Sequence, residues 1–320
     1  MKPKILYLYP KHLLNKKYFN QLAKKFKKGN FIFIDETKKN KIFKEAESSN
    51  AIINCPQKYF NNELLKKSKK LQWVHTGRAG VEDMIFDKFQ QSNITLTCGK
   101  VIQGPGLADH AVALILYFSR NIGHYSSNRK KFFSRPIELK NKTCGIIGLG
   151  GAGMLIAERL KSFGMRVIGF SDEIPQMISS IDEFIDVEKI YENLKDIDVL
   201  VCAAPLTNVT KNFINYDFFK KMKKDSIFIN ISRGKIVNLK DLVKNRIFKK
   251  FKGLGLDVTD PEPLSKNNLL KKSENVLITN HSAGLSDVNR SRSIELLNAN
   301  LNRFFKKMSL LNVVDKYKGY

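Results

Sequence analysis

Short apolar runs alternate with polar segments along the first hundred residues of this chain. Five runs are rich in Ile, Tyr, Phe and Val, as β-strands are: residues 5–9, 31–35, 51–55, 71–76 and 94–98. The stretches between them carry Lys, Glu and Asn among spaced apolar residues, as amphipathic helices do. Strands that alternate with helices predict a parallel sheet, so we expect an α/β fold.

A second series of elements begins near residue 100. Residues 104–125 predict one long helix that opens with Gly-Pro-Gly, and it is so apolar that we expect it in a core or a subunit interface. Strand-like runs follow within TCGII and at residues 165–170, 198–204, 226–232, 254–258 and 275–279. The segment 287–307 predicts a last helix, because its apolar residues have helical spacing. A chain of 320 residues suits two domains of roughly 150 residues each.

Three ionisable residues each follow a strand-like run in the second half of the chain: Arg233, Glu262 and His281. Ligands of open parallel sheets bind outside the carboxyl ends of the strands. If these runs are neighbours, a cation, a carboxylate and an imidazole converge there. They could bind a small anion and move a proton beside it. Taken singly, each residue is more often structural, as a surface Arg, a surface Glu in a turn or a core His.

The three side chains suit different tasks. His281 is the best proton donor and acceptor, because an imidazole titrates near physiological pH. Glu262 could hold the ring of His281, and Arg233 offers a rigid fork that matches a carboxylate.

Gly148, Gly150 and Gly153 form a G-x-G-x-x-G pattern directly between a predicted strand and a predicted helix. The first glycine permits a tight turn, the second lets a pyrophosphate approach, and the third lets the helix pack on the strand. Gly151 and Ala152 would present N–H groups to phosphates at the helix N-terminus. An ordinary glycine-bearing turn is the alternative interpretation.

The end of the next strand bears on cofactor choice. Asp172 lies 19 residues beyond Gly153, Glu173 follows it, and no Arg or Lys occurs before Lys189. An acidic residue at about this distance grips the ribose 2′-hydroxyl of NAD. Two carboxylates would repel a 2′-phosphate, so the pattern favours NAD(H) over NADP(H).

The net charge of +26 is the one unusual bulk property. It could indicate nucleic acid or an anionic membrane as a partner, but Lys and Arg are spread over the chain without a long block. We therefore expect a solvated basic surface and no specific nucleic acid. The longest apolar run, residues 111–118, falls short of the roughly 18 residues that span a bilayer.

Cysteine and histidine spacing points to no further chemistry. The four cysteines form no CxxC, which favours small core residues in a reducing compartment over disulfides. The five histidines form no HExxH pattern, so we expect no metal site. The N-terminus lacks an apolar stretch long enough for a signal peptide, and we expect a cytoplasmic protein.

The chain resembles the D-isomer-specific 2-hydroxyacid dehydrogenases over essentially its whole length. The segments that carry the resemblance are, in chain order, residues 76–83, 108–110, 148–153, 204–207 with Thr210, 230–234, 256–258, 262–264, 279–284 and 312–315. Within 279–284 the chain has Asn280 where the family has Pro.

The resemblance implies roles for residues in these segments. Arg233 would bind the substrate carboxylate and carbonyl, His281 would be the acid/base, and Glu262 would orient it. The backbone N–H groups of Ala79 and Gly80 would hold the carboxylate, and Arg78 beside them would either bind a second substrate anion or be a solvated loop residue.

The resemblance also implies a cofactor site. It comprises the glycine turn, Pro205, Thr210, Ser232, Asp257 at the nicotinamide carboxamide, His281 and Gly284. The family's acidic residue after the second strand of this domain aligns with Ser171, and not with Asp172. Relatives with Ser there often prefer NADP, usually with a following Arg that this chain lacks, so NADP(H) stays open as the alternative.

The family fold is a flavodoxin-like substrate domain with an inserted Rossmann NAD(P)-binding domain. Here they would comprise residues 1–99 plus 287–320, and residues 100–286, with the active site in the interdomain cleft. The helix at 104–125 would form a homodimer. The implied activity is NAD(P)H-dependent reduction of a small 2-ketoacid, such as glyoxylate or hydroxypyruvate, to the D-2-hydroxyacid. A phosphoglycerate dehydrogenase-type activity and a nucleotide-sensing, corepressor-like binding protein are the alternatives.

Overall fold

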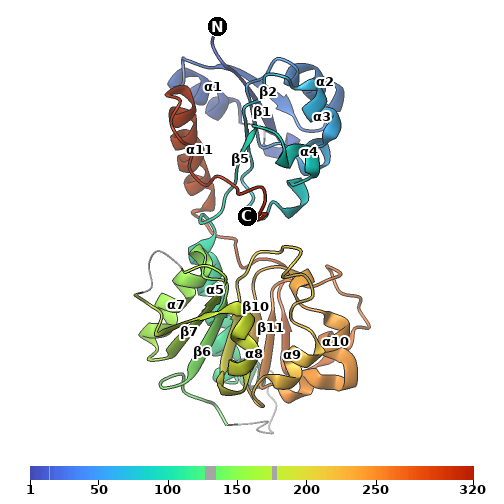
Figure 1. Ribbon diagram of the computed structural model, residues 1–320, viewed down its shortest axis with the longest axis vertical. Helices are drawn as coiled ribbons and strands as arrows, with labels where there is room; N and C mark the ends of the chain where they lie inside the picture. The colour runs from blue at the N-terminus through green and yellow to red at the C-terminus, as the bar shows by residue number, and fades with distance from the viewer. Residues whose placement is uncertain (14, 127–134, 175–178) are drawn as a thin grey trace. The chain divides into compact units, whose positions relative to one another are not determined.

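The computed structural model describes residues 1–13, 15–126, 135–174 and 179–320. The chain divides into two compact units, Met1–Ile102 with Asp287–Tyr320 (unit 1) and Gln103–Ser286 (unit 2). Each unit contains one parallel sheet with helices on both faces (Figure 1). The prediction of an α/β fold is confirmed.

Unit 1 is built on a five-stranded sheet in the order β2-β1-β3-β4-β5, which is the flavodoxin-like order. Its strands are β1 (Lys4–Tyr9), β2 (Asn30–Asp35), β3 (Ala51–Ile53), β4 (Trp73–His75) and β5 (Thr95–Thr97). Its α-helices are α1 (Lys16–Lys25), α2 (Lys39–Ala46), α3 (Asn62–Lys67), α4 (Asp87–Gln90) and α11 (Asn289–Phe305), and its 3-10 helices are η1 (Lys11–Leu13), η2 (Gln57–Tyr59) and η3 (Glu82–Met84).

Helices α1 and α11 cover one face of this sheet, and α2, α3 and α4 cover the other. Phe19 of α1 and Leu297 of α11 pack with Trp73 of β4, whereas Ile42 and Leu64 pack on the opposite face. A parallel sheet that is covered on both faces needs strands of continuous apolar residues. For this reason the strands could be recognised in the sequence as apolar runs.

Unit 2 is built on a seven-stranded sheet in the order β12-β11-β10-β9-β6-β7-β8. Its strands are β6 (Thr143–Ile147), β7 (Arg166–Ser171), β8 (Glu183–Asp186), β9 (Val199–Cys202), β10 (Ile227–Asn230), β11 (Gly253–Leu256) and β12 (Val276–Ile278). Counted from β6, this is the Rossmann order 3-2-1-4-5-6 with one further strand.

The two faces of this sheet are also covered. Its α-helices are α5 (Gly104–Ser119), α6 (Ile122–Ser126), α7 (Gly151–Ser162), α8 (Ile190–Asn193), α9 (Tyr216–Lys221) and α10 (Leu239–Val243), and its 3-10 helices are η4 (Val187–Lys189), η5 (Leu194–Asp196), η6 (Gly234–Ile236), η7 (Lys244–Lys250) and η8 (Leu269–Lys272). Helices α5 and α7 share one core with the sheet, and α8, α9 and α10 share the other.

The prediction of a single helix over residues 104–125 is wrong. Helix α5 ends at Ser119, and the short α6 begins at Ile122. Between them Asn121 adopts a left-handed backbone conformation with φ of 55°, which a continuous α-helix excludes. The Asn121 side chain accepts a hydrogen bond of 3.0 Å from Lys252 Nζ. The last predicted helix is confirmed as α11, whereas the edge strand β8 was not predicted.

The cysteines and the longest apolar segments were also considered in the sequence. All four cysteines are free and buried, as predicted for core residues. In the part of the chain that the structure describes, no helix combines the length and apolar character that a membrane span needs.

Buried hydrogen bonds link His75, at the end of β4, to Thr97 and Trp73. Thr97 Oγ1 lies 2.8 Å from Trp73 Nε1 and 2.8 Å from His75 Nδ1. The indole N–H can only donate, so the Thr97 hydroxyl accepts from Trp73. The same hydroxyl meets His75 Nδ1 with its second lone pair or with its own hydrogen. Burial lowers the pKa of His75 to about 4, which agrees with a neutral ring.

The burial of His75 predicts a pH-dependent stability of unit 1. The folded pKa of His75 lies below the unfolded value, so the unfolded state binds more protons between about pH 6.5 and 4. Stability is full above this window and falls within it by on the order of 3 kcal/mol. The variant His75→Gln should lose this part of the acid sensitivity. Urea unfolding at pH 7.5 and pH 4.5, followed by Trp73 fluorescence, measures the free energy of unfolding. Equal pH dependence in both proteins would contradict the buried, neutral state of His75.

Candidate active site

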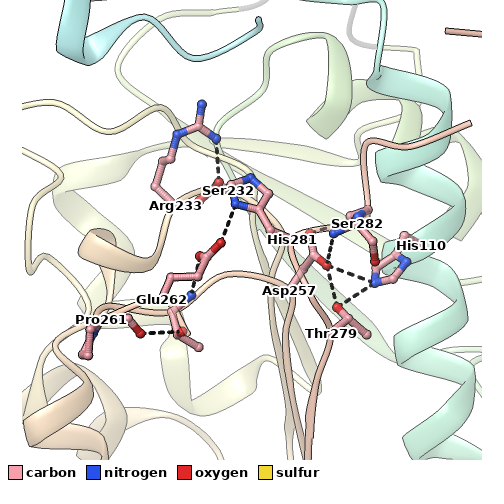
Figure 2. A network of polar contacts seen from close by, with 11 residues as sticks. His110, Ser232, Arg233, Asp257, Pro261, Glu262, Thr279, His281 and Ser282 are labelled. Carbon is pink, nitrogen blue, oxygen red and sulfur yellow. Dashed lines mark hydrogen bonds and ion pairs between the residues drawn. The ribbon is translucent and has the colours of Figure 1, made fainter. Parts of the chain in front are cut away.

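Three adjacent strands of unit 2 end at one level and bring the polar residues of the sequence prediction together (Figure 2). Asn230 of β10 pairs with Leu256 of β11, and Leu256 pairs with Ile278 of β12. Arg233 and His281 each follow their strand by three residues, and Glu262 lies in the segment that follows β11. The carboxyl edge of the sheet therefore collects all three side chains.

His281 and Glu262 form a direct pair. His281 Nδ1 lies 2.8 Å from Glu262 Oε1, and the two side chains are 50% and 41% exposed. Glu262 Oε2 accepts the Thr259 N–H at 3.3 Å, so both carboxylate oxygens have partners. An ionised carboxylate only accepts hydrogen bonds, so Nδ1 of His281 donates. Nε2 is then the ring nitrogen that remains to exchange a proton with a bound molecule.

The turn that carries Arg233 packs against the segment that carries Glu262. A Cβ atom added to Gly234 would lie 2.0 Å from the Thr259 carbonyl oxygen, so only glycine fits there. Buried Asn230 ties this turn together: its amide nitrogen donates to the Arg233 carbonyl at 3.1 Å, and its Oδ1 accepts from Ser232 N–H and Oγ. Arg233 Nη1 donates to the Ser232 carbonyl at 2.8 Å.

Buried Asp257 holds the loop of His281. Its carboxylate accepts hydrogen bonds from Thr279 Oγ1 at 2.5 Å, Ser282 N–H at 2.9 Å and Ala283 N–H at 3.0 Å. Its backbone carbonyl accepts the N–H of His281 at 2.9 Å. His281 itself has a left-handed φ of 51°, which a residue other than glycine adopts only where its surroundings enforce it. Asp257 therefore acts on His281 through the loop.

His110 of α5 extends this network, and the sequence patterns did not predict its contribution. Its Nε2 lies 3.1 Å from Thr279 Oγ1 and 3.6 Å from Asp257 Oδ1. Thr279 uses its hydrogen on Asp257, so it accepts from His110. The only signal for His110 was its place in a segment that resembles a family motif.

The glycine turn between β6 and α7 has the shape that a dinucleotide needs. Gly148 has φ of +90°, and a Cβ atom there would lie 2.6 Å from Ala204 Cα. A Cβ atom on Gly153 would lie 2.0 Å from the Gly148 carbonyl, whereas one on Gly150 would meet nothing within 4 Å. The first and third glycines are thus required by packing, and the second borders open space.

The N-terminus of α7 adds hydrogen-bond donors at that space. The N–H groups of Gly151 and Ala152 have no acceptor within the helix, and the helix dipole favours an anion beside them. The turn therefore fits the pyrophosphate of a dinucleotide.

The remaining candidate cofactor residues of unit 2 follow its strands. Ser171 ends β7, and its Oγ lies 3.4 Å from Oδ1 of the exposed Asp172. Ala204, against Gly148, leads into Pro205, whose carbonyl accepts a hydrogen bond of 2.7 Å from Thr210. Ser232 is buried 3.4 Å from Cys202 Sγ, and Gly284 directly follows Ala283.

The three residues predicted for the substrate loop lie in unit 1. Arg78 Nη2 forms an ion pair with Asp83 Oδ2 at 3.0 Å. The N–H groups of Ala79 and Gly80 donate to no acceptor among the described residues, so they remain open to a ligand.

The chain is similar to known proteins. Residues 112–283 match the sequence model of the D-isomer-specific 2-hydroxyacid dehydrogenase NAD-binding domain. The chain is 30% identical to a glyoxylate reductase of Pyrococcus horikoshii, over 82% of each protein. It is 32% identical to the human glyoxylate reductase/hydroxypyruvate reductase, over 72% of each.

A solved structure has the same fold. The probable 2-hydroxyacid dehydrogenase of Rhizobium etli, in complex with NADP, HEPES and L(+)-tartaric acid, superimposes with a TM-score of 0.81 at 24% identity, over the whole of both chains. The chain belongs to the D-isomer-specific 2-hydroxyacid dehydrogenase family, and it is an oxidoreductase with an NAD-binding domain.

Two glycine substitutions separate packing from ligand binding in the turn. Gly153→Ala should lower the stability of unit 2 by about 1–3 kcal/mol, because its Cβ atom would overlap the Gly148 carbonyl. Gly150→Ala should leave stability within about 0.5 kcal/mol of the wild type and weaken NADH binding, because its Cβ atom would occupy the open space. Thermal unfolding and fluorescence titration with NADH measure the two effects. Wild-type NADH affinity in Gly150→Ala would rule out this cradle.

Proposed function

We propose that the protein reduces a small 2-ketoacid to the D-2-hydroxyacid, with His281 as the proton donor. The observation that carries the proposal is the 2.8 Å contact between His281 and Glu262, beside the turn of Arg233. The names of the relatives point to glyoxylate or hydroxypyruvate as the substrate.

The residues divide the work of the reaction. A bound reduced nicotinamide supplies the hydride. The Arg233 guanidinium binds the carboxylate and stabilises negative charge on the ketoacid oxygen, and His281 Nε2 protonates that oxygen. Glu262 keeps the ring oriented and stabilises its positive charge while the proton is held. The roles that the family resemblance implies for Ala79 and Gly80 of unit 1 stay predictions.

For the cofactor we propose NAD(H) over NADP(H). Asp172 and Glu173 follow β7 directly, where their charges oppose a 2′-phosphate. The Rhizobium etli structure contains NADP, so the choice depends on these side chains and not on the fold.

Removal of the imidazole tests the proposed reaction. His281→Ala should lower kcat by about 10²- to 10⁴-fold, which is the usual contribution of an acid/base group, and should still bind NADH. Glu262→Gln should lower kcat less. It removes the charge that stabilises the protonated ring, but it keeps a hydrogen-bond acceptor for His281. Glu188→Gln, an exposed carboxyl change in η4, is the control and should retain wild-type activity.

The assay is the consumption of NADH or NADPH with a panel of ketoacids. The panel includes glyoxylate, hydroxypyruvate and 3-phosphohydroxypyruvate, so that a phosphoglycerate dehydrogenase-type activity is also detected. No turnover of any ketoacid between pH 5 and 9 would refute the proposed reaction.

The cofactor proposal has its own measurement. Wild-type kcat/KM should be higher with NADH than with NADPH, and Asp172→Asn should narrow the difference several-fold, because it removes one repelling charge. A wild-type preference for NADPH would contradict the role of Asp172.

A further inference from the structure

His110 joins the hydrogen bonds of Asp257 from a different element, although the proposed reaction gives it no task. It lies in α5, and its side chain is 23% exposed. Its Nε2 is 3.1 Å from Oγ1 of Thr279, which directly follows β12. That hydroxyl lies 2.5 Å from Oδ1 of Asp257, which directly follows β11 (Figure 2). The three side chains therefore form one chain of polar contacts.

The carboxylate sets the direction of these hydrogen bonds. An ionised carboxylate only accepts, and a hydroxyl group has one hydrogen, so Thr279 donates that hydrogen to Asp257. The oxygen of Thr279 then accepts, and His110 donates from Nε2. A neutral ring with its hydrogen on Nδ1 would place two acceptors opposite each other at 3.1 Å. The neutral ring of His110 therefore carries its hydrogen on Nε2.

Donation by His110 fixes the hydroxyl group of Thr279. A hydroxyl group rotates freely unless its partners hold it, and here a donor on one side directs its hydrogen to Asp257 on the other. Hydrogen bonds in such a chain also strengthen one another. The Asp257 carboxylate holds the N–H groups of Ser282 and Ala283, which directly follow His281. His110 therefore acts on the His281 loop through two intermediate side chains.

Close packing keeps α5 at the distance that this contact needs. A Cβ atom added to Gly106 would lie 3.3 Å from the Ala283 carbonyl oxygen, so the start of α5 lies directly against the His281 loop. His110 follows Gly106 by four residues, so both lie on the same face of the helix. This face brings the imidazole to Thr279.

We propose that His110 is a positioning residue of the reaction. Its Nε2–H group fixes the Thr279 hydroxyl and, through Asp257, the loop from which His281 donates its proton. The proposal rests on the proposed ketoacid reduction and assigns His110 no contact with substrate or cofactor. Loss of the donor should therefore lower kcat and leave the KM for NADH close to that of the wild type.

Two substitutions of His110 test the need for a donor. His110→Leu should lower kcat by about tenfold, the upper end for one neutral hydrogen bond, with the KM for NADH within about twofold of the wild type. His110→Gln should keep most of kcat, because its amide nitrogen can donate to Thr279 in place of Nε2. If His110→Gln is as impaired as His110→Leu, although both unfold at the temperature of the wild type, the proposal is wrong.

A double-mutant cycle shows whether His110 acts through Thr279. Thr279→Val removes the hydroxyl group, so His110→Leu should lower kcat by less than about twofold in that background. An equal loss in both backgrounds would contradict the path through Thr279, because packing of the ring does not depend on the hydroxyl group. His12→Leu, the same change at an exposed histidine of η1 in unit 1, is the control and should keep wild-type kcat.

NMR tests the positioning even if no ketoacid is reduced, a result that would refute the proposed function alone. The probes are the backbone N–H groups of residues 281–283, which bond to Asp257. Their hydrogen exchange should be several-fold faster in His110→Leu and unchanged in His110→Gln and His12→Leu. At pH 9, where an imidazole is neutral, the ring of His110 should carry its hydrogen on Nε2. Unchanged exchange in His110→Leu, or a neutral ring with its hydrogen on Nδ1, would overturn the proposal.

Discussion

The buried carboxylate of Asp257 is the contact on which the candidate active site depends. It accepts three hydrogen bonds from residues 279–283, while its backbone carbonyl accepts a fourth from His281. A buried charge is stable only when donors of this kind compensate for its lost hydration. The same contacts hold His281 in a left-handed conformation. The contact between His281 and Glu262 therefore depends on Asp257, although Asp257 need not touch the reacting atoms.

Close backbone packing complements this carboxylate. Gly234 lets the turn of Arg233 approach Thr259, and Gly153 lets α7 approach the turn at Gly148. In both places a single Cβ atom would force two segments apart. The space that borders Gly150 is different, because no protein atom fills it. Unit 2 thus combines enforced close contacts with one opening at a helix N-terminus, where an anion is stabilised.

Much of the fold follows from the sequence for a simple physical reason. Both sheets are covered on both faces, so their strands are continuous apolar runs that stand out from the helices. Because parallel strands end at one edge, the convergence of Glu262 and His281 could be predicted before any distance was known. The break between α5 and α6 could not, because it depends on the left-handed Asn121 and its contact with Lys252. Strand β8 is short, carries two acidic residues and lies at an edge, so it lacks the apolar signal.

Tertiary hydrogen bonds account for the rest. The partners of Asp257 include the backbone N–H groups of Ser282 and Ala283, and no sequence pattern predicts such contacts. The family resemblance implied only that Asp257 binds the cofactor. His75 is hydrogen-bonded to Thr97, 22 residues away on a neighbouring strand. A pocket in unit 1 is lined by residues from both ends of the chain, Tyr7 and Arg290 among them. Contacts of this kind can be identified only in the folded structure.

The most direct test of this account is the kcat of Asp257→Asn with the best ketoacid substrate, measured together with its affinity for NADH. Asn has nearly the same shape, but only its oxygen can accept, so its NH2 group would face at least one of the three donors that hold the loop. We expect kcat to fall by about 10²-fold, the usual cost of a misplaced catalytic group, while NADH binding is retained. An unchanged kcat, or a loss of NADH affinity that accounts for the whole effect, would contradict it.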